Sequence, residues 1–349
     1  MFSVNNQMMA AVLYGKENLQ IEAVPVPEIG AGDVLVRVKT ALTCGTDVKV
    51  FRRGYHARMI VPPALFGHEL AGDIVLVGDA VREFRVGQRV VAANSAPCLN
   101  CFYCRRGNEN LCEDLLFNNG AYAQYIRIPA RIVEQNLYEL PFHVSYQDAA
   151  LVEPLACVLR GLDETGVRQG DTVAVMGLGP IGSMFVRLAK IYGARVIAIG
   201  RRPTQLERAF HLGADELLIA ADGIDVAGRV RELTGGHGAD IAIEAVGMPE
   251  AWQAAVRMLR RGGTVNFFGG CPSNTHIQLD TQLLHYSEIT CKASFHHTPA
   301  HIRKALEIVS RGEITSRDFV NRVEPLSNLL LVMQHLMSHN GHMKTAIIP

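Results

Sequence analysis

The first 150 residues carry short segments in which apolar and polar side chains alternate. Such segments occupy residues 34–38 (VLVRV), 72–77 (GDIVLV), 89–92 (RVVA) and 122–128 (YAQYIRI). Glycine and proline residues separate them, which is typical of short strands joined by tight turns. This part of the chain is therefore predicted to form an irregular domain that is rich in β-structure.

The pattern changes near Asp148, where residues 149–161 have apolar positions at helical spacing. From Thr172 onward, apolar runs of strand length alternate with amphipathic segments of helix length. The predicted strands are 172–176, 195–199, 216–219, 239–245 and 264–268, and the predicted helices are 181–192, 204–212, 226–233 and 250–259. Nearly all-apolar strands that alternate with helices predict a parallel sheet covered on both faces.

The last part of the chain, residues 299–349, contains one more helical segment at 301–310 and a strand-like end at 345–348. This tail does not continue the strand–helix alternation that precedes it. A return of the tail to the β-rich domain would make that domain discontinuous. The pattern as a whole predicts an α/β protein of two domains.

Composition excludes several classes of protein. Of the 349 residues, 48% are apolar and 19% are charged, so a large core can be buried. Lys and Arg number 34, as do Asp and Glu, so no net field attracts nucleic acid or an anionic membrane. The longest apolar runs, such as 196–199 and 329–333, are far shorter than the roughly 20 residues of a bilayer span. Residues 1–9 lack the pattern of a secretory signal, and a cytoplasmic protein is expected.

A glycine-rich turn follows the first apolar strand of the alternating region. Residues 177–182 read Gly-Leu-Gly-Pro-Ile-Gly between the strand 172–176 and the helix 181–192. In a G-x-G-x-x-G turn, the glycines allow a tight turn, close approach of a pyrophosphate, and close packing of helix on strand. The free N–H groups at the helix start then face the phosphates. The order strand, turn, helix favours a dinucleotide site over an ordinary turn.

The second strand indicates which dinucleotide is bound. An NAD site normally has Asp or Glu about 20 residues further on, at the end of this strand. Here the strand is followed by Gly200, Arg201 and Arg202, and the next carboxylate is Glu207. Two guanidinium groups suit a 2′-phosphate, which favours NADP(H) over NAD(H), unless both arginines are merely solvated. The predicted cofactor-binding residues are Gly177, Gly179, Pro180, Ile181, Gly182, Gly200, Arg201, Arg202 and Val246.

Four of the eight cysteines fall within a short stretch, as Cys98, Cys101, Cys104 and Cys112. Such spacing, without a secretory signal, is typical of metal binding rather than of disulfides. Four thiolates close a tetrahedral zinc site with no open position, so a structural zinc is predicted in the lobe 95–113. The alternatives are an iron–sulfur cluster and a nucleic-acid-binding zinc ribbon, and the zero net charge disfavours the ribbon.

Cys44, His68 and Glu153 form a second candidate metal set, although none is diagnostic alone. A lone cysteine, histidine or glutamate is more often structural than ligating. Beside a nicotinamide site, however, the three would give a catalytic zinc its nitrogen, sulfur and carboxylate ligands and leave one position exchangeable.

Together these motifs resemble the zinc-dependent medium-chain alcohol and polyol dehydrogenases over essentially the whole chain. The matching segments are CGTD at 44–47, GHELAGDIVLVG at 67–78, GQRVV at 87–91, the cysteine lobe, LVEPLACVL at 151–159, GLGPIG at 177–182 and GADELL at 213–218. The resemblance implies a GroES-like catalytic domain of residues 1–156 and 295–349 around a Rossmann domain of residues 157–294. It also implies a cleft between them that holds the reactive zinc, and assembly as a dimer or tetramer.

The resemblance also implies roles for individual residues. Cys44 and His68 correspond to direct zinc ligands. Glu69 corresponds to a nearby carboxylate that either binds the zinc or contacts its ligands without binding the zinc itself. Glu153, within VEPL, corresponds to the glutamate that the polyol branch has in place of a cysteine. Thr46 corresponds to the hydroxyl residue that links the alcohol to a proton relay.

One departure concerns the substrate pocket. Phe295, His296 and His297 stand where sorbitol dehydrogenases carry a polar, partly cationic pair, which weakens the case for sorbitol itself. Further candidates for lining the pocket are Tyr55, His56 and Phe117, and each of these has an ordinary structural interpretation as well.

The expected activity is hydride transfer between a secondary alcohol of polyol, cyclitol or sugar type and a nicotinamide cofactor, with two zinc ions per chain. The catalytic zinc would stabilise the alkoxide, and Thr46 would pass its proton towards solvent. The substrate is thus a small alcohol or ketone, with no nucleic acid or membrane partner. The alternatives are an L-threonine 3-dehydrogenase-like amino-alcohol dehydrogenase, a zinc-free quinone or enone reductase, and a regulatory protein that kept the fold.

Overall fold

The computed structural model describes residues 6–338 and 343–349. Residues 1–5, part of the segment considered for a secretory signal, lie outside the described residues. The chain forms two compact units, one of Met1–Ala156 with His297–Pro349 and one of Cys157–His296. Across both described ranges, no helix has the length and apolar character that crossing a bilayer requires.

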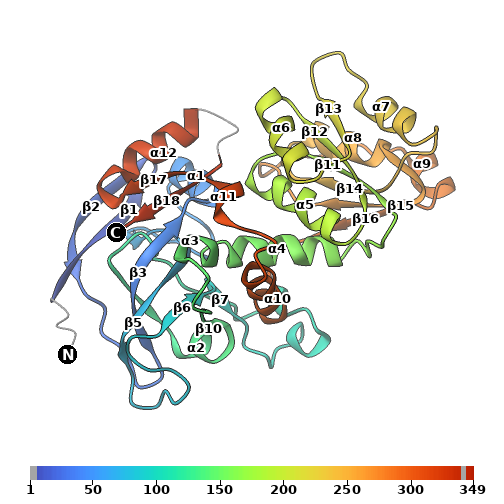
Figure 1. Cartoon of the computed structure of the whole chain (residues 1–349). Coiled ribbons are helices and arrows are strands. Elements are labelled where there is room, and N and C mark those ends of the chain that lie inside the picture. Colours follow the sequence, from blue (N-terminus) through green and yellow to red (C-terminus); the bar gives the residue numbers. More distant parts are fainter. Residues whose placement is uncertain (1–5, 339–342) are drawn as a thin grey trace. The chain divides into compact units, whose positions relative to one another are not determined.

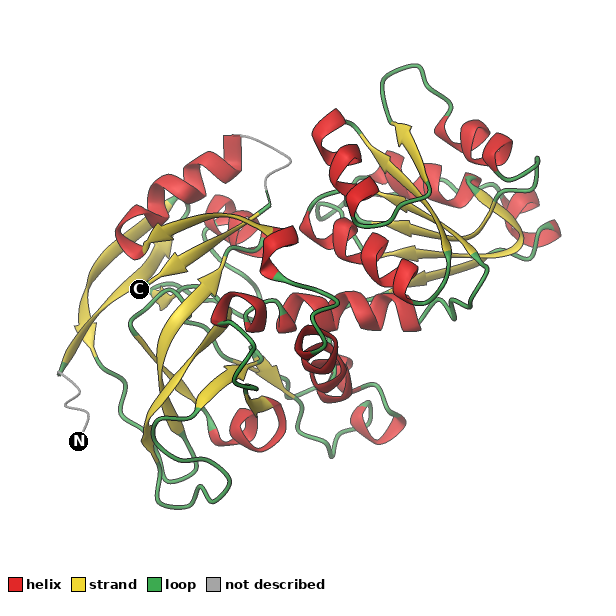
Figure 2. Cartoon of the chain, in the orientation of Figure 1, coloured by secondary structure: helices red, strands yellow, loops and turns green. Residues whose placement is uncertain are grey.

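The first unit is built mainly from strands, which Figure 2 shows in yellow. Its main sheet has the order β10-β6-β5-β3-β18-β17, with β9 also paired to β3, and two smaller sheets have the orders β2-β1-β4 and β7-β8. The strands are β1 (Gln7–Gly15), β2 (Asn18–Pro25), β3 (Val34–Leu42), β4 (Ala64–Leu65), β5 (Glu69–Val77), β6 (Arg89–Ala92), β7 (Ser95–Ala96), β8 (Leu116–Phe117), β9 (Tyr125–Ile128), β10 (Leu137–Glu139), β17 (Val320–Pro325) and β18 (Lys344–Ile348).

Helices of the first unit are short, apart from three that reach ten residues or more. They are α1 (Gly45–Arg53), η1 (Cys104–Arg106), η2 (Glu109–Leu111), α2 (Ala130–Asn136), α3 (Tyr146–Ala149), α4 (Val152–Asp163), α10 (Pro299–Ser310), α11 (Ser316–Phe319), η3 (Leu326–Asn328) and α12 (Leu329–Ser338). The helix α4 begins in the first unit and ends in the second.

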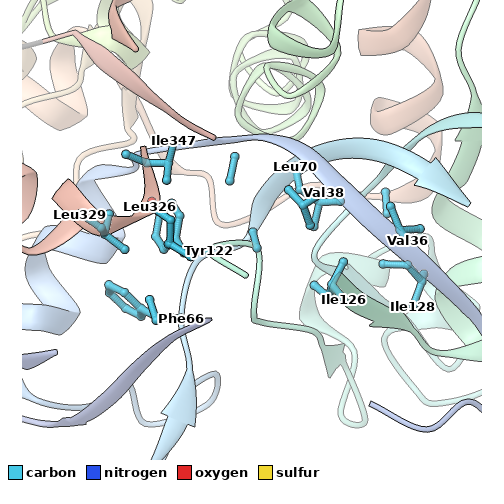
Figure 3. Close-up of a cluster of buried hydrophobic side chains, with 14 of the residues drawn as sticks. Val36, Val38, Phe66, Leu70, Tyr122, Ile126, Ile128, Leu326, Leu329 and Ile347 are labelled. Carbon is cyan, nitrogen blue, oxygen red and sulfur yellow. The ribbon is translucent and has the colours of Figure 1, made fainter. Parts of the chain in front are cut away.

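The C-terminal strand β18 lies inside the main sheet, between β3 and the edge strand β17. It pairs antiparallel with β3, with Ile347 opposite Ala41, and parallel with β17. The core beneath this sheet combines side chains from both ends of the chain, among them Phe66, Tyr122, Leu326 and Ile347 (Figure 3). The first unit is therefore discontinuous in sequence.

The second unit is a six-stranded parallel sheet of order β13-β12-β11-β14-β15-β16. Helices pack against it, as Figure 1 shows for α5 and α6 near β11 and β12 and for α8 near β14. The elements are β11 (Thr172–Met176), α5 (Pro180–Ile191), β12 (Arg195–Gly200), α6 (Pro203–His211), β13 (Glu216–Ile219), α7 (Val226–Leu233), β14 (Ala239–Glu244), α8 (Pro249–Arg257), β15 (Leu259–Phe267), α9 (Thr281–Tyr286) and β16 (Thr290–Ala293).

The direction of winding reverses between β11 and β14. From β11 the chain adds β12 and β13 on one side, and it then returns to add β14, β15 and β16 on the other. In such a doubly wound sheet, ligands bind outside the carboxyl ends of the strands at this switch point. The predicted fold class, a β-rich unit with a doubly wound parallel sheet, is confirmed.

Two details of the second unit differ from the sequence pattern. The helix α8 ends at Arg257, before the expected residue 259, because Leu259 already pairs with Ala239 as the start of β15. All four residues of the strand β16 are exposed at the sheet edge. The sequence therefore contains no apolar run there that would predict a strand.

Candidate metal and cofactor sites

The pairing of β3 with β5 brings the first candidate ligands together. Leu42, the last residue of β3, lies opposite Glu69, the first residue of β5. Cys44 follows Leu42 by two positions, and His68 immediately precedes Glu69. The Cys44 sulfur, a His68 ring nitrogen and a Glu69 carboxylate oxygen all lie within 4.8 Å of one another.

Cys44 is held at the N-terminus of α1 by a reciprocal pair of hydrogen bonds. The backbone N–H of Thr46 donates to Sγ of Cys44 (3.4 Å), and the backbone N–H of Cys44 donates to Oδ2 of Asp47 (3.1 Å). This capping-box arrangement fixes the direction of the thiol. Thr46 lies in the same helical turn and is half-buried.

His68 is buried, and the carboxylate of Asp47 lies beside one edge of its ring. Nδ1 of His68 lies 3.0 Å from Oδ1 of Asp47. Burial alone would lower the pKa of His68, but the charges of Asp47 and Cys44 raise it well above its usual value. An imidazole held at Nδ1 by a carboxylate presents Nε2 as the ligand atom, as histidine does at metal sites.

Glu69 is fully buried and is bound by Lys344, a residue that sequence reasoning missed. Nζ of Lys344 lies 2.6 Å from both carboxylate oxygens of Glu69 and 3.1 Å from the carbonyl oxygen of Thr43. Burial raises the pKa of Glu69, and the Lys344 ammonium group opposes that rise. The available signal was a single charged residue at the start of the otherwise uncharged strand β18.

Glu153 lies in the first turn of α4, outside the group formed by Cys44, His68 and Glu69. Its Oε1 lies 3.8 Å from Nε2 of His297, whose ring also contacts Oδ1 of Asn94 (3.1 Å). Burial raises the pKa of Glu153 to about 7, while the charge of His68 lowers it. The electrostatic influence of His68 indicates that Glu153 borders the same region.

The remaining candidates for the substrate pocket occupy diverse environments. His297 is buried, and the preceding His296 has a left-handed backbone with φ of 66°. Tyr55 is 58% exposed, whereas Phe117 is half-buried in β8 opposite Ser95.

His56 has a structural task within its own turn. Its Nδ1 accepts hydrogen bonds from the backbone N–H groups of Arg58 (3.2 Å) and Met59 (3.1 Å). Burial, followed by the charge of Arg53, lowers the pKa of His56. At least one ring nitrogen of His56 is therefore used by the turn.

The four cysteines of the lobe converge as a tetrahedral site requires. The sulfur atoms of Cys98, Cys101, Cys104 and Cys112 all lie within 4.8 Å of one another, and the sulfurs of Cys101 and Cys112 are 4.0 Å apart. A zinc–sulfur distance of about 2.3 Å gives sulfur–sulfur separations of about 3.8 Å in a regular tetrahedron. The donor set therefore fits zinc.

Without a bound cation, the thiols of the lobe differ in how readily they ionise. A hydrogen bond from the backbone of Cys104 contributes most to lowering the pKa of Cys101 to about 6. Burial raises the pKa of Cys104 to about 12, so that sulfur resists ionising without a nearby positive charge. A divalent cation supplies the charge that allows all four thiols to ionise.

The glycine-rich turn has the geometry that a pyrophosphate needs. Gly177 has φ of 96°, and a Cβ atom at Gly182 would lie 1.7 Å from the carbonyl oxygen of Gly177. Beside Gly179, which precedes α5, the space is open to at least 4 Å. Pro180 and Ile181 form the first turn of α5, where unsatisfied N–H groups favour an anion.

The end of β12 presents arginines and no carboxylate. A Cβ atom at Gly200 would lie 2.8 Å from Cδ1 of Leu178, so a larger residue would disturb the turn. Arg201 and Arg202 follow and are both exposed. Within residues 6–338 and 343–349, neither guanidinium group has an ion-pair partner.

Val246 lies beside this turn, held by a carboxylate that the sequence analysis did not select. Glu244 ends β14, and its Oε1 accepts hydrogen bonds from the backbone N–H groups of Val246 (2.7 Å) and Gly247 (2.8 Å). A Cβ atom at Gly177 would lie 2.7 Å from Cγ2 of Val246. A charged residue at the carboxyl end of an apolar strand was the signal for Glu244.

Two family profiles match the chain. The profile described as "Alcohol dehydrogenase GroES-like domain" matches residues 30–141, and "Zinc-binding dehydrogenase" matches residues 180–311. The first match contains Cys44, His68, Glu69 and the cysteine lobe, and the second begins within the glycine-rich turn.

Similar proteins cover nearly the whole chain. Sorbitol dehydrogenase of Bacillus subtilis (strain 168) is 32% identical over 355 residues and covers 99% of each chain. D-xylulose reductase A of Aspergillus niger is 30% identical over 99% of this chain and 98% of its own. Among solved structures, a zinc-binding dehydrogenase of Sinorhizobium meliloti 1021 bound to NADP has a TM-score of 0.89 at 31% identity, covering 99% of this chain and 100% of its own.

Proposed function

Because the chain belongs to the zinc-dependent medium-chain alcohol and polyol dehydrogenases, oxidoreductases that act on CH–OH groups with a nicotinamide cofactor, we propose that its substrate is a secondary alcohol of polyol, cyclitol or sugar type. The observation that carries this proposal is the convergence of Cys44, His68 and Glu69 at the adjoining ends of β3 and β5. Two similar proteins are named for sorbitol and D-xylulose, which supports a polyol or the corresponding ketose.

Two zinc ions per chain are part of this proposal. Cys98, Cys101, Cys104 and Cys112 would hold a structural ion. For the catalytic ion, Cys44 and His68 would be ligands, with carboxylates available from Glu69 and Glu153. Bound there, zinc supplies a Lewis acid that lowers the pKa of an alcohol hydroxyl group.

The side chains of the protein itself have three tasks in this scheme. Asp47 orients the His68 ring, and Lys344 holds the Glu69 carboxylate. Thr46, half-buried beside Cys44, would accept the substrate proton and pass it towards solvent. A bound nicotinamide ring would supply the acceptor for the hydride of the alcohol carbon.

NADP(H) is the proposed cofactor. Arg201 and Arg202 are exposed at the end of β12, where a 2′-phosphate would need charged donors, and Gly200 avoids the clash with Leu178 that a side chain would cause. The similar dehydrogenase of Sinorhizobium meliloti was crystallised with NADP, which supports the same choice.

A substrate panel tests the function and the cofactor together. Polyols, cyclitols and amino alcohols are each incubated with NADP⁺ and with NAD⁺, and the absorbance of the reduced nicotinamide is followed. We expect oxidation of a polyol-type secondary alcohol, with a higher kcat/KM for NADP⁺. Strong preference for L-threonine would favour the amino-alcohol alternative, and turnover of quinones alone would favour the zinc-free reductase, which the similar proteins do not support.

The arginine pair provides the control for cofactor choice. The Arg201→Ala/Arg202→Ala protein loses charge-assisted hydrogen bonds to the 2′-phosphate, so its KM for NADP⁺ is expected to rise about 10- to 100-fold. Its KM for NAD⁺, which lacks that phosphate, should change little. Equal changes for both dinucleotides would contradict the proposed role.

Assembly and location complete the proposal. The edge strand β16 (Thr290–Ala293) has four exposed residues, which supports pairing with a second copy into a dimer or tetramer. Sedimentation equilibrium is expected to give a multiple of 38.2 kDa. None of the eight cysteines, all of which lie in the described part of the chain, forms a disulfide, which supports the reducing cytoplasm as the place of action.

A further inference from the structure

Tyr122 is a fully buried tyrosine whose hydroxyl group lies inside the apolar core of the first unit. Figure 3 shows it among Phe66, Leu326 and Ile347. Its hydroxyl group donates to Oδ2 of Asp47 at 2.6 Å and lies 3.0 Å from the carbonyl oxygen of Leu42. A phenol has one proton to donate, and the shorter distance assigns it to the carboxylate.

Asp47 depends on this hydroxyl group because it has few other partners. The carboxylate is 1% exposed, and no lysine or arginine pairs with it in the described part of the chain. Oδ2 accepts from the backbone N–H of Cys44 and from Tyr122, while Oδ1 faces Nδ1 of His68 at 3.0 Å. Removing the tyrosine hydroxyl group would leave a buried carboxylate with one donor fewer.

The ring of Tyr122 also supports the backbone that carries His68. Gly67 precedes His68 and has φ of 89°, and a Cβ atom there would lie 2.5 Å from the Tyr122 ring. The backbone N–H of Tyr122 donates to the carbonyl oxygen of Phe66 (3.0 Å), and that of Ala121 donates to Gly67 (3.1 Å). Tyr122 therefore contacts both the main chain before His68 and the carboxylate that faces its ring.

We propose that Tyr122 is a positioning residue for the catalytic metal site, and that it acts through Asp47 on the tautomer and direction of the His68 ring. With Oδ2 fixed by Tyr122 and Cys44, Oδ1 is turned to Nδ1 of His68, which leaves Nε2 for the cation. This inference rests on the proposed function, since it assigns a role at the same metal site.

The Tyr122→Phe protein is the direct test, because it keeps the ring that packs on Gly67 and removes only the hydroxyl group. Loss of an outer partner of a metal ligand typically costs about 10- to 100-fold in metal affinity or activity. We expect chelator competition to show a fall of about tenfold in Zn²⁺ affinity at the catalytic site. The visible absorption of the Co²⁺-substituted protein should also change, because its ligand geometry changes.

Two further variants separate positioning from simple support of the core. Tyr138→Phe is the matched control, since Tyr138 donates to the backbone carbonyl oxygen of Gln135 (3.0 Å), and its metal affinity should match that of the wild type. In the Asp47→Asn background, Tyr122→Phe is expected to cause little additional loss, because both changes interrupt one chain of contacts.

The outcomes distinguish this inference from the proposed function. If the wild-type protein binds no Co²⁺ outside the cysteine lobe, the proposed function and the inference both fail. If the wild type binds Co²⁺ and Tyr122→Phe leaves both the spectrum and the Zn²⁺ affinity unchanged, the inference alone is overturned. A full additional loss in the Asp47→Asn background would likewise overturn it, because Tyr122 would then act independently of Asp47.

Discussion

Replacing Cys44 with serine is expected to lower kcat/KM for alcohol oxidation by about a thousandfold and to reduce the zinc content from two ions per chain to one. Lewis-acid stabilisation of the reacting oxygen contributes several kcal/mol, and each 1.36 kcal/mol corresponds to a factor of ten in rate. Zinc content is measured by plasma mass spectrometry, and turnover by the absorbance of the reduced nicotinamide.

Serine suits this experiment because it preserves the local fold. The Cys44 sulfur accepts a hydrogen bond from the backbone N–H of Thr46 at the start of α1, and serine is among the preferred residues at that position. The helix should therefore form normally while the thiolate is lost. The cofactor-binding turn is in the other unit, so NADP⁺ binding measured by calorimetry should remain.

Cys291→Ser is the matched control, because Cys291 is an exposed cysteine on β16. That protein is expected to keep both zinc ions and its turnover. Retained oxidation in Cys44→Ser would refute a catalytic metal at this position. Loss of both zinc ions together would show that the substitution had unfolded more than the site.

The sequence predicts most of what is local. Apolar runs of strand length and helical patterns indicate the strands and helices of the second unit, and the spacing from Cys98 to Cys112 indicates a metal lobe without any long-range information. The glycine-rich turn was likewise predictable from the sequence. Gly177 and Gly182 are required by the backbone geometry of one short segment. These features depend on residues that are close in the chain.

Two contacts that depend on distant pairing were not predicted. Lys344 and Glu69 are separated by 275 positions, and only the placement of β18 beside β3 brings them together. The hydroxyl group of Tyr122 reaches Asp47 across 75 positions. Each looks ordinary in sequence, since a tyrosine in a predicted strand is usually core and a lysine near a terminus is usually solvated.

Glu153 was selected from the sequence, but its position differs from that of the other candidate zinc ligands. The sequence analysis grouped it with Cys44 and His68, yet in the structure it lies outside the group formed by Cys44, His68 and Glu69, and its Oε1 is 3.8 Å from Nε2 of His297. A sequence motif identifies the residue type at a position, but it does not specify the direction of the side chain. The role of Glu153 as a zinc ligand therefore stays a prediction.

Replacing Lys344 with methionine is expected to destabilise the first unit by about 3–5 kcal/mol, the cost of removing one partner from a buried ion pair. Lys344 is 3% exposed and Glu69 is fully buried, so the carboxylate would lose its counter-charge without gaining water. Methionine fills a similar volume, which limits any additional cost from a cavity. The loss of stability should be largest in β3, β5 and β18, the strands that meet at this ion pair.

Amide hydrogen exchange locates the effect, because peptides from those three strands should exchange faster at equal denaturant concentration. The single tryptophan, Trp252, lies in the second unit, so its fluorescence reports whether that unit is affected as well. Lys190→Met is the matched control, since the Lys190–Asp215 pair is partly exposed and such pairs contribute at most about 1 kcal/mol. The double variant Lys344→Met/Glu69→Gln removes the unpaired charge and should recover part of the stability. If Lys344→Met were no more destabilising than Lys190→Met, the buried pair would not hold this part of the sheet together.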